Sequence, residues 1–440
     1  MKDINIPLAN LVLAIAGTID LVSAKVANHH TRVAYIASEI ASELGLTAEQ
    51  RIEVVQAAAL HDVGALSLKD KLDLMEFEAR APETHQAAGY LLLSTLTQFR
   101  HLAGIVLYHH SRWDAGPQGA VPIESRILHV ADRIAVLIPE DPNILAEVPD
   151  IQMKIREGSG SLFMPDIVEA FMNLSAKEAF WLDAVSSLDS YLTEKSASQS
   201  VLLNGEGLIE FSVLVSKIID FKSRFTAVHS CGVAAAAEAL ARFAGFSDDD
   251  SLTMRTAGYL HDLGKLAVPS EIIEKPRSLD FSEYGNMRRH TFYTHRVLQK
   301  IKGFETIKDW ASLHHERLDA SGYPFHLGKD SIPLGSRIMA VADVFTALTE
   351  DRPYRKGMKG SEALKILREM VLQNAFDSEV ASVLDSHFDD IDYIRRTAQS
   401  RAASEYGEFC KNLNEMSVRS GLALISDKKG GDAPPFLDQR

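Results

Sequence analysis

The sequence predicts an all-α protein built from two similar helical bundles in tandem. Three observations lead to this prediction. Apolar residues recur with the helical period, no stretch of the sequence shows the strict alternation of a half-buried strand, and the same pattern of charged and apolar residues occurs twice along the chain. We therefore interpret the chain as an internal duplication.

The helical period is clearest early in each half. In the first half the apolar stripe stops at Gly45, and in the second it stops at Gly245, where glycine favours the end of a helix. The stripes consist of Val33, Ile36, Ala37, Ile40 and Leu44, and of Val233, Ala236, Ala237, Leu240 and Ala244. Thr47 and Gln50 then form a capping-box pattern that begins the next helix, and Ser247 and Asp250 form a looser version of it.

Histidine and aspartate residues follow the same register. His29 and His61-Asp62 correspond to His229 and His261-Asp262. Further along, His85, His109-His110 and Asp132 correspond to His290, His314-His315 and Asp343. Because only 16 of the 440 residues are histidine, chance does not explain this register.

Length and composition limit the function. A chain of 440 residues is long enough for two domains, and its net charge of −14 argues against a nucleic-acid-binding protein. Two cysteines, Cys231 and Cys410, cannot form a disulfide framework, so we expect a cytoplasmic protein. The apolar segment 8–22 is shorter than the ~20 apolar residues of a membrane-spanning helix. We expect it to be a buried first helix, with no membrane association.

The repeat suggests domain boundaries. We expect a first domain at 1–195, a polar linker at 196–206, a second domain at 207–400, and a carboxyl-terminal helix with a disordered tail at 401–440. Long helical patterns at 178–192 and 391–413 close the two copies.

The second copy carries a candidate metal centre. One buried histidine is usually a hydrogen-bonded core residue, but a set of inward-facing histidines and aspartates is costly to bury without a ligand. Imidazole and carboxylate ligands without thiolates suit Fe, Mn, Zn, Co or Ni. The aspartate beside His261 can bridge two cations, and Lys265 adds a positive charge one turn away. The predicted ligands are His229, His261, Asp262, His290, His314, His315 and Asp343.

Together with these ligands, three motifs of the second copy resemble the HD-GYP phosphodiesterases over about residues 208–388. The motifs are His261-Asp262-x-Gly264-Lys265, His314-His315-Glu316-x-x-Asp319-x-x-Gly322-Tyr323-Pro324, and Asp343-Val-Phe-Thr-Ala-Leu, which continues into Asp351-Arg352-Pro353-Tyr354-Arg355. The resemblance implies hydrolysis of a 3′–5′ bond in a cyclic dinucleotide, cyclic di-GMP or 3′,3′-cyclic GMP-AMP. It also implies that the seven residues bind divalent metal ions, Fe or Mn above others, with Asp262 as the bridge.

The resemblance further assigns the substrate contacts. It implies that Asp262 and Lys265 act in catalysis and that Lys265, Arg352, Arg355 and Tyr323 bind the substrate. The loop Gly322-Tyr323-Pro324 is implied as a contact for a diguanylate-cyclase-type partner. This chain departs from the family at Phe225, where many members have a glutamate that supports a third metal, so we expect two ions. It also has Ala320 where glycine is usual.

The first copy keeps its ligands but lacks the substrate-binding residues. Ala65 replaces the lysine, no Gly-Tyr-Pro segment follows His109-His110, and Asp141 puts a negative charge in the place of Arg352. We therefore interpret it as a degenerate regulatory HD domain. Its residues could form a second, non-catalytic metal site from His29, His61, Asp62, His85, His109, His110 and Asp132.

Two other functions fit part of this pattern. An HD-type phosphohydrolase would act on mononucleotides, although the Gly-Tyr-Pro segment disfavours it. A sensor or scaffold would bind a cyclic dinucleotide without cleaving it, which the complete ligand set and Lys265 disfavour in the second copy.

Overall fold

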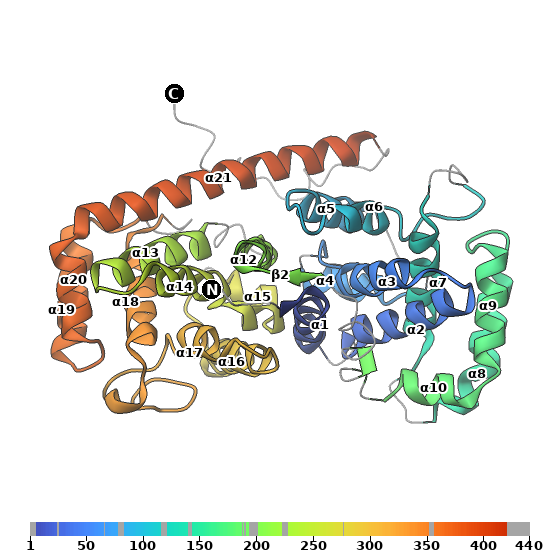
Figure 1. The fold of residues 1–440 in the computed structure, drawn as a ribbon, viewed down its shortest axis with the longest axis horizontal. Coiled ribbons are helices and arrows are strands. Elements are labelled where there is room, and N and C mark those ends of the chain that lie inside the picture. Colours follow the sequence, from blue (N-terminus) through green and yellow to red (C-terminus); the bar gives the residue numbers. More distant parts are fainter. Residues whose placement is uncertain are drawn as a thin grey trace. The chain divides into compact units, whose positions relative to one another are not determined.

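The computed structural model describes residues 6–23, 26–65, 67–77, 83–115, 121–139, 143–186, 188, 191–192, 201–221, 228–275, 277–351 and 356–419. Helices dominate these residues, which confirms the all-α prediction (Figure 1). The chain divides into two compact units. The first comprises Met1–Ile218, Gly264–Pro269 and Arg296–Glu305, and the second comprises Ile219–Leu263, Ser270–His295 and Thr306–Arg440.

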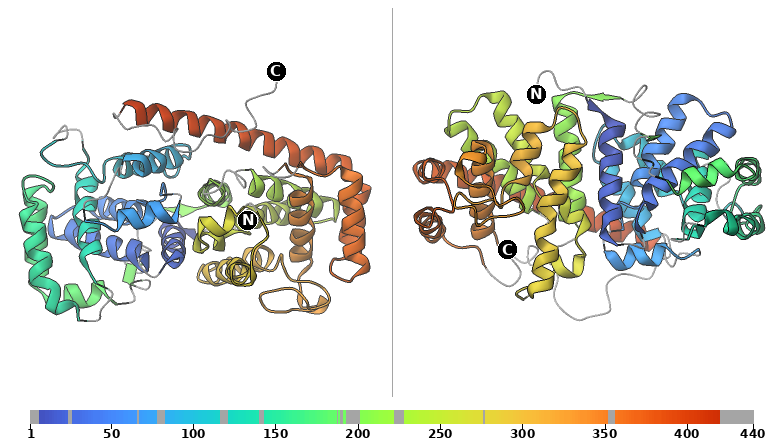
Figure 2. Two further views of the ribbon diagram at one scale, coloured as in Figure 1. Left: turned by 180° about the vertical axis from the view of Figure 1, so that it is seen from behind. Right: turned by 90° about the horizontal axis from the view of Figure 1, so that it is seen from below.

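The first copy consists of successive helices, coloured blue to green in two further views (Figure 2). Its helices are α1 (Leu8–Ile19), α2 (His29–Glu43), α3 (Ala48–Leu60), α4 (Leu68–Leu74), α5 (Glu83–Ser94), α6 (Arg100–Leu107), α7 (Ile123–Leu137), α8 (Ile144–Glu157), α9 (Pro165–Ser175) and α10 (Glu178–Ala184), with the 3-10 turn η1 (Asp20–Val22) after α1.

The second copy repeats this order, and some of its helices match their counterparts in length while others are longer. It contains α12 (Gly205–Asp220), α13 (His229–Phe243), α14 (Asp248–Leu260), α15 (Ser270–Ile273), α16 (Phe281–Gln299), α17 (Glu305–Ser312), α18 (Leu334–Thr349), α19 (Gly360–Leu372), α20 (Ser378–Ser386) and α21 (Phe388–Arg419). Two 3-10 turns, η3 (Leu263–Ala267) and η4 (Lys329–Ser331), lie between these helices.

A small two-stranded sheet was not predicted. β1 (Ile6–Pro7) pairs in antiparallel fashion with β2 (Leu202–Leu203), which lies within the segment 196–206 that we expected to be a linker. Strands of two residues give no alternation that a sequence pattern could reveal.

The predicted helix boundaries are local and well defined. The Thr47 side chain accepts from the N–H of Gln50, and the Gln50 side chain accepts in return from the N–H of Thr47, so the capping box is formed. Ser247 accepts from the N–H of Asp250 at 3.1 Å in the second copy. Gly45 and Gly245 adopt φ values of +72° and +87°, which glycine tolerates without a steric penalty. The helix ends predicted at these glycines are confirmed.

The closing helices differ from the predicted lengths. α10 ends at Ala184, well before residue 192. Just after this end, the Ser186 hydroxyl donates to the carbonyl of Asp183, a bond that competes with continuation of the helix. α21 extends from Phe388 to Arg419 and is longer than the pattern at 391–413. The predicted disordered tail lies outside the described residues.

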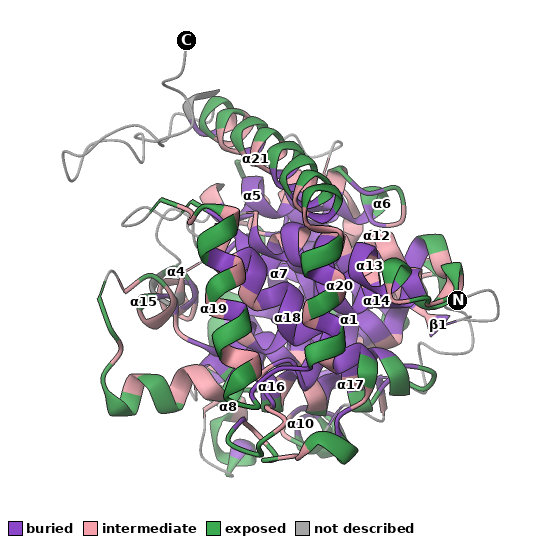
Figure 3. Ribbon diagram, turned by 90° about the vertical axis from the view of Figure 1, so that its left-hand side faces the viewer, coloured by how far each residue is buried: buried purple, intermediate pink, exposed green. Residues whose placement is uncertain are grey.

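The buried residues mark the core of each unit. α1 is almost wholly buried, as expected for segment 8–22, and no described helix is long and apolar enough to cross a membrane. In the second unit the central helices α13, α14 and α18 carry buried residues along most of their length, whereas α19, α20 and α21 expose most of their outer faces (Figure 3). His229 begins α13 and His261 follows α14, as His29 begins α2 and His61 follows α3 in the first copy.

Candidate metal centre

The structure brings the predicted ligands of the second copy together. They come from the start of α13, the end of α14, the middle of α16, the end of α17 and the middle of α18. Their side chains converge although the residues lie far apart in the sequence. The converging residues are His229, His261, Asp262, His290, His314, His315 and Asp343.

Asp262 lies at the middle of this cluster. Its Oδ2 atom is 3.2 Å from Nε2 of His261, and its Oδ1 atom is 3.4 Å from Nε2 of His290. On one side, Nε2 of His229 lies 3.2 Å from Oδ1 of Asp343. The two oxygens of Asp262 therefore face different histidines, which is the arrangement that a carboxylate needs in order to bridge two cations.

Three overlapping groups in this cluster could each hold a metal ion, because their ligand atoms lie within 4.8 Å of one another. Two of them, which share no residue, are His229 with His261 and Asp343, and His290 with His314 and His315. The third joins His261, Asp262 and His314. The donor set of imidazoles and carboxylates fits divalent transition metals.

Backbone carbonyls orient the imidazole rings. The Nδ1–H of His261 donates to the carbonyl of Gly258 at 2.7 Å, and that of His314 donates to Ala311 at 2.7 Å. His290 makes the same bond to Met287 at 2.6 Å. A proton on Nδ1 leaves the Nε2 lone pair facing the cluster, as a metal ligand requires. The bonds to Gly258 and Ala311 also satisfy carbonyls that would lack a partner at a helix end.

Glu350 completes the cluster and was missed by the sequence reasoning. Its Oε2 atom lies 3.1 Å from Nδ1 of His229 and accepts from Nε2 of Gln399 at 3.2 Å. The carboxylate is buried, with 4% of its surface exposed. Glu350 follows Asp343 by seven residues, a helical spacing that could have indicated a shared face.

Charges inside the cluster shift the pKa values in opposite directions. Burial alone would raise the pKa of Asp343, but the bond and charge of His229 hold it well below its usual range. Burial, reinforced by the charge of His315, lowers the pKa of His314 well below its ordinary value, so this imidazole is neutral. Although burial opposes it, Glu350 and Asp343 raise the pKa of His229 to about 10. A cation would therefore compete with a proton at His229.

The Gly322-Tyr323-Pro324 loop lies beside the histidines. The ring of Tyr323 is 4.9 Å from that of His315 and 4.6 Å from the guanidinium of Arg288. Buried Glu316 fixes the loop by accepting from the N–H groups of Phe325 and Leu327. Burial raises the pKa of the Tyr323 hydroxyl above its ordinary value, so it remains a donor. Arg288 was not predicted, although it lies two residues before His290.

The remaining predicted substrate contacts are less defined. Lys265 is half-buried in η3, immediately after the His261-Asp262 pair. Arg352 and Arg355 lie outside the described residues, as do Phe225 and Asp141.

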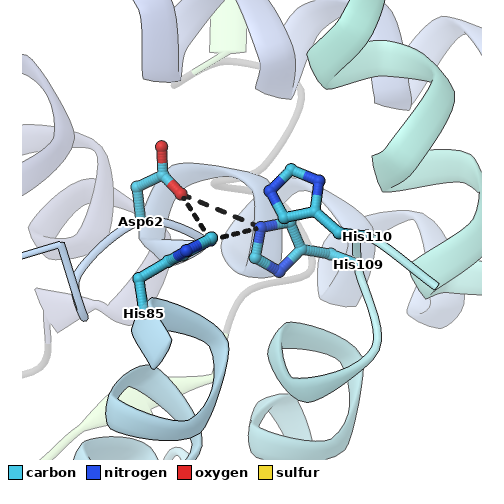
Figure 4. Close-up of side chains that lie close together, drawn as sticks. All are labelled: Asp62, His85, His109 and His110. Atoms are coloured by element: carbon cyan, nitrogen blue, oxygen red, sulfur yellow. Dashed lines mark hydrogen bonds and ion pairs between the residues drawn. The ribbon is translucent and has the colours of Figure 1, made fainter. Parts of the chain in front are cut away.

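The first copy forms a similar cluster (Figure 4). Oδ1 of Asp62 is 3.3 Å from Nε2 of His85 and 3.8 Å from Nε2 of His109, and these two nitrogens are 3.2 Å apart. His110 lies beside them. His61 contacts Oδ2 of Asp62 at 3.2 Å, and His29 contacts Oδ1 of Asp132 at 3.3 Å. The seven predicted residues of this copy are thus also neighbours.

Two buried cations near Asp62 and Asp132, Arg133 and Lys71, were not predicted. Arg133 binds Asp132 through Nε and a terminal nitrogen. Lys71 on α4 is 4% exposed, and burial lowers its pKa to about 8 despite the charges of Asp62 and Asp20. Asp20 itself accepts from Nδ1 of His30 at 2.6 Å. Sequence pattern could have indicated Arg133, because Val344 stands at the corresponding position of the second copy.

Comparisons with known proteins agree with this arrangement. Residues 26–137 and 213–380 each match an HD domain family. The chain is 33% identical over 403 residues to 3′3′-cGAMP-specific phosphodiesterase 1 of Vibrio cholerae, covering 87% of this chain and 93% of that protein. It is 40% identical over 157 residues to a cyclic di-GMP phosphodiesterase of Pseudomonas aeruginosa, covering 36% of this chain and 37% of that protein.

A solved structure shares the fold. The crystal structure of a cyclic GMP-AMP-specific phosphodiesterase of V. cholerae matches with a TM-score of 0.63 and 24% identity, covering 88% of this chain and 98% of that one. The two domain matches and the nearly full-length relative confirm the resemblance inferred from the motifs. The chain belongs to the HD-domain phosphodiesterases of the HD-GYP type, with two HD domains in tandem.

Proposed function

We propose that the protein is a metal-dependent phosphodiesterase that opens a 3′–5′ linkage of a cyclic dinucleotide. The observation that carries this proposal is the position of Asp262, whose two oxygens face His261 and His290. A carboxylate placed in this way suits a pair of cations, and such pairs serve the cleavage of phosphate esters. The catalytic domain is assigned to residues 207–400, and the first domain, 1–195, is assigned a regulatory role.

The ligand residues divide between two ions, with Fe or Mn as the proposed metals. His229, His261 and Asp343 would hold one ion, and His290, His314 and His315 would hold the other, with Asp262 between them. When bound, two divalent ions activate water and neutralise charge on the phosphate. Water then attacks phosphorus, the bond to the 3′ oxygen breaks, and that oxygen takes up a proton. The product is a linear dinucleotide with a 5′ phosphate.

The chain supplies further contacts to the substrate. The Tyr323 hydroxyl, kept protonated by burial, can donate to a phosphate oxygen. Lys265, Arg352 and Arg355 are proposed to bind phosphate, since a cation beside the developing negative charge stabilises the transition state. A diguanylate-cyclase-type partner at the Gly322-Tyr323-Pro324 loop and a cytoplasmic location stay predictions.

The relatives suggest which substrate to test first. The relative that matches across nearly the whole chain is named for 3′,3′-cyclic GMP-AMP, whereas the cyclic di-GMP phosphodiesterase matches about a third of the chain. We therefore propose 3′,3′-cyclic GMP-AMP as the first substrate and cyclic di-GMP as the second.

The decisive experiment is product analysis with full-length protein reconstituted with Mn or Fe. Wild-type protein should convert a cyclic dinucleotide to the linear form, and the double variant His261→Ala/Asp262→Ala should lose this activity while keeping its helical circular dichroism. The matched control, His387→Ala/Asp389→Ala, changes the same residue types away from the cluster and should stay active. Retained activity in the first variant contradicts the assigned site.

Two outcomes would favour the other functions. Tight binding of the cyclic dinucleotide with no product after long incubation would indicate a sensor. Faster hydrolysis of mononucleotides than of cyclic dinucleotides would indicate an HD-type phosphohydrolase. Turnover by a variant in which only the first copy keeps its ligands would overturn the regulatory assignment of 1–195.

A further inference from the structure

Arg133 is fully engaged beside the first cluster. Its Nε and one terminal nitrogen donate to Oδ2 of Asp132 at 3.1 and 2.6 Å. The other donors reach the backbone carbonyls of Leu74, Glu76 and Phe77 at 3.1, 2.6 and 3.1 Å. These five bonds match the five N–H donors of a guanidinium. Arg133 is 3% exposed, so it is a fixed positive charge on one oxygen of Asp132.

The second cluster has no positive charge at the position that corresponds to Arg133. Val344 follows Asp343, whose ion pairs are with His229 and His261. Glu350 adds a third carboxylate there, whereas Pro139 occupies the corresponding position of the first copy. Asp262, Asp343 and Glu350 therefore act on the second cluster, beside buried Asp220, which corresponds to Asp20 of the first copy. In the first, Asp62 and Asp132 are offset by the guanidinium, so less negative charge remains for cations.

The groups able to hold a metal differ accordingly. In the second copy Asp343 joins His229 and His261 in such a group, but the corresponding group of the first copy, His29 with His61 and Asp62, does not include Asp132. Asp62 also belongs to a second and larger group, with His85, His109 and His110. One carboxylate is thus shared between the two halves of the first cluster.

The larger group has the dimensions of a coordination site (Figure 4). Metal–ligand bonds of about 2.0–2.1 Å place tetrahedral ligand atoms about 3.3–3.4 Å apart. The distances among Asp62, His85 and His109 are 3.2, 3.3 and 3.8 Å. The Nδ1–H of His109 donates to the carbonyl of Val106, which leaves its Nε2 lone pair facing the other two ligands.

Buried polar atoms at this place lack hydrogen bonds within the described residues. They include Oδ1 of Asp62 and Nε2 of His110, and in the other half of the cluster Nε2 of His29, Nε2 of His61 and Oδ1 of Asp132. Burying such atoms without a partner is costly, and a cation coordinated by them would remove the cost.

We propose that the first copy holds a single metal ion, bound by Asp62, His85, His109 and His110, and that Arg133 takes the place of the second ion. This inference extends the proposed metal site of the first copy and does not depend on catalysis. Four protein ligands close a tetrahedral site and leave no position for substrate water. The ion would therefore stabilise the first domain instead of acting on a substrate.

The test counts metal in the full-length chain. The His261→Ala/Asp262→Ala background weakens the second cluster, so the remaining Mn or Zn per chain, measured by mass spectrometry after removal of loose metal, reports on the first copy. One ion per chain is expected. His85→Ala should reduce this number to zero, whereas the matched variant His29→Ala, also a buried histidine, should leave it at one. Metal lost equally in both variants would overturn the proposal.

Arg133→Val, which introduces the residue found in the second copy, tests the cause. This variant should raise the number of ions bound per chain from one to two. With Mn²⁺, its electron paramagnetic resonance spectrum should change from that of an isolated ion to that of a coupled pair. Arg133→Lys keeps the positive charge and should keep one ion. Two ions with Arg133 intact, or none, would refute the proposal. If Arg133→Val does not fold, the His29 and His85 variants still decide which half binds the ion.

Discussion

Oε2 of Glu350 lies 3.1 Å from Nδ1 of His229, while Nε2 of the same ring lies 3.2 Å from Oδ1 of Asp343. The imidazole of His229 thus lies between two carboxylates. Glu350 fixes the orientation of the ring, and Asp343 is its neighbour among the proposed metal ligands. Gln399 of α21 donates to the same oxygen of Glu350 at 3.2 Å. The long last helix therefore contributes to the position of a proposed metal ligand.

Glu350→Gln should weaken metal binding without unfolding the protein. The negative charge of Glu350 orients His229 and makes it more basic, and the amide lacks this charge. Losing such a partner typically reduces metal affinity about 10–100-fold. Chelator competition with Mn²⁺ measures the affinity. The exposed residue Glu369 provides the control, Glu369→Gln, which should bind as wild type. Equal affinities for both variants would contradict the role of Glu350.

Arg288→Met should weaken substrate binding more than it slows chemistry. The guanidinium stacks on Tyr323 at 4.6 Å beside the cluster, where it can both orient the ring and attract an anionic substrate. We expect a higher KM with a smaller change in kcat. Its neighbour Arg289 is exposed and stacks on Tyr293 instead, so Arg289→Met is the matched control. Steady-state kinetics on both variants check this prediction, and an equal rise in KM would refute it.

Ala320→Gly should stabilise the protein. Ala320 adopts φ of +61°, in the left-handed region, where a Cβ atom costs roughly 1–2 kcal/mol. Glycine removes this cost but adds about 0.4–1 kcal/mol of unfolded-state entropy, so a net gain of about 0–1.6 kcal/mol is expected. Denaturant unfolding measures it. A lower stability of the variant would show that the loop favours alanine for another reason.

Asp377→Asn should reduce stability only where the carboxylate is charged. Asp377 begins α20 by accepting from the N–H groups of Glu379 and Val380, and Arg337 lies 2.9 Å from its Oδ2 atom. Burial opposes the charge, but the bond to Arg337 and those to the helix N–H groups hold the pKa of Asp377 below its ordinary value of 3.8. The folded state therefore favours the charged form.

Its contribution to stability is complete above pH ~4 and is lost as the pH falls through the lowered pKa. Asparagine still caps a helix, so the difference between wild type and variant should be largest near neutral pH and vanish in acid. Asp377→Ala, which also removes the cap, should cost about 1 kcal/mol more. Unfolding measured across this pH range checks the sign. A difference that persists unchanged in acid would exclude the charge as its source.

The sequence by itself determined the all-α class, the duplication and the histidines and aspartates that converge in both clusters, but not Glu350 or Arg133 beside them. These features depend on interactions between residues close together in the sequence, or on the spacing at which the repeat recurs. Thr47 and Gln50 cap a helix wherever that segment lies, Gly45 ends one because of its own backbone freedom, and repeated spacing places His61 and His261 at equivalent helix ends.

The tertiary structure alone decided how each cluster is charged. Arg133 is fixed by carbonyls 56 to 59 residues earlier in the chain, and Glu350 contacts a histidine 121 residues away. Helical spacing shows which face such a residue occupies but not what packs against that face. The electrostatic difference between the two copies therefore arises from packing between distant segments, because a charge interacts with whatever lies within a few ångströms of it, whatever the separation along the chain.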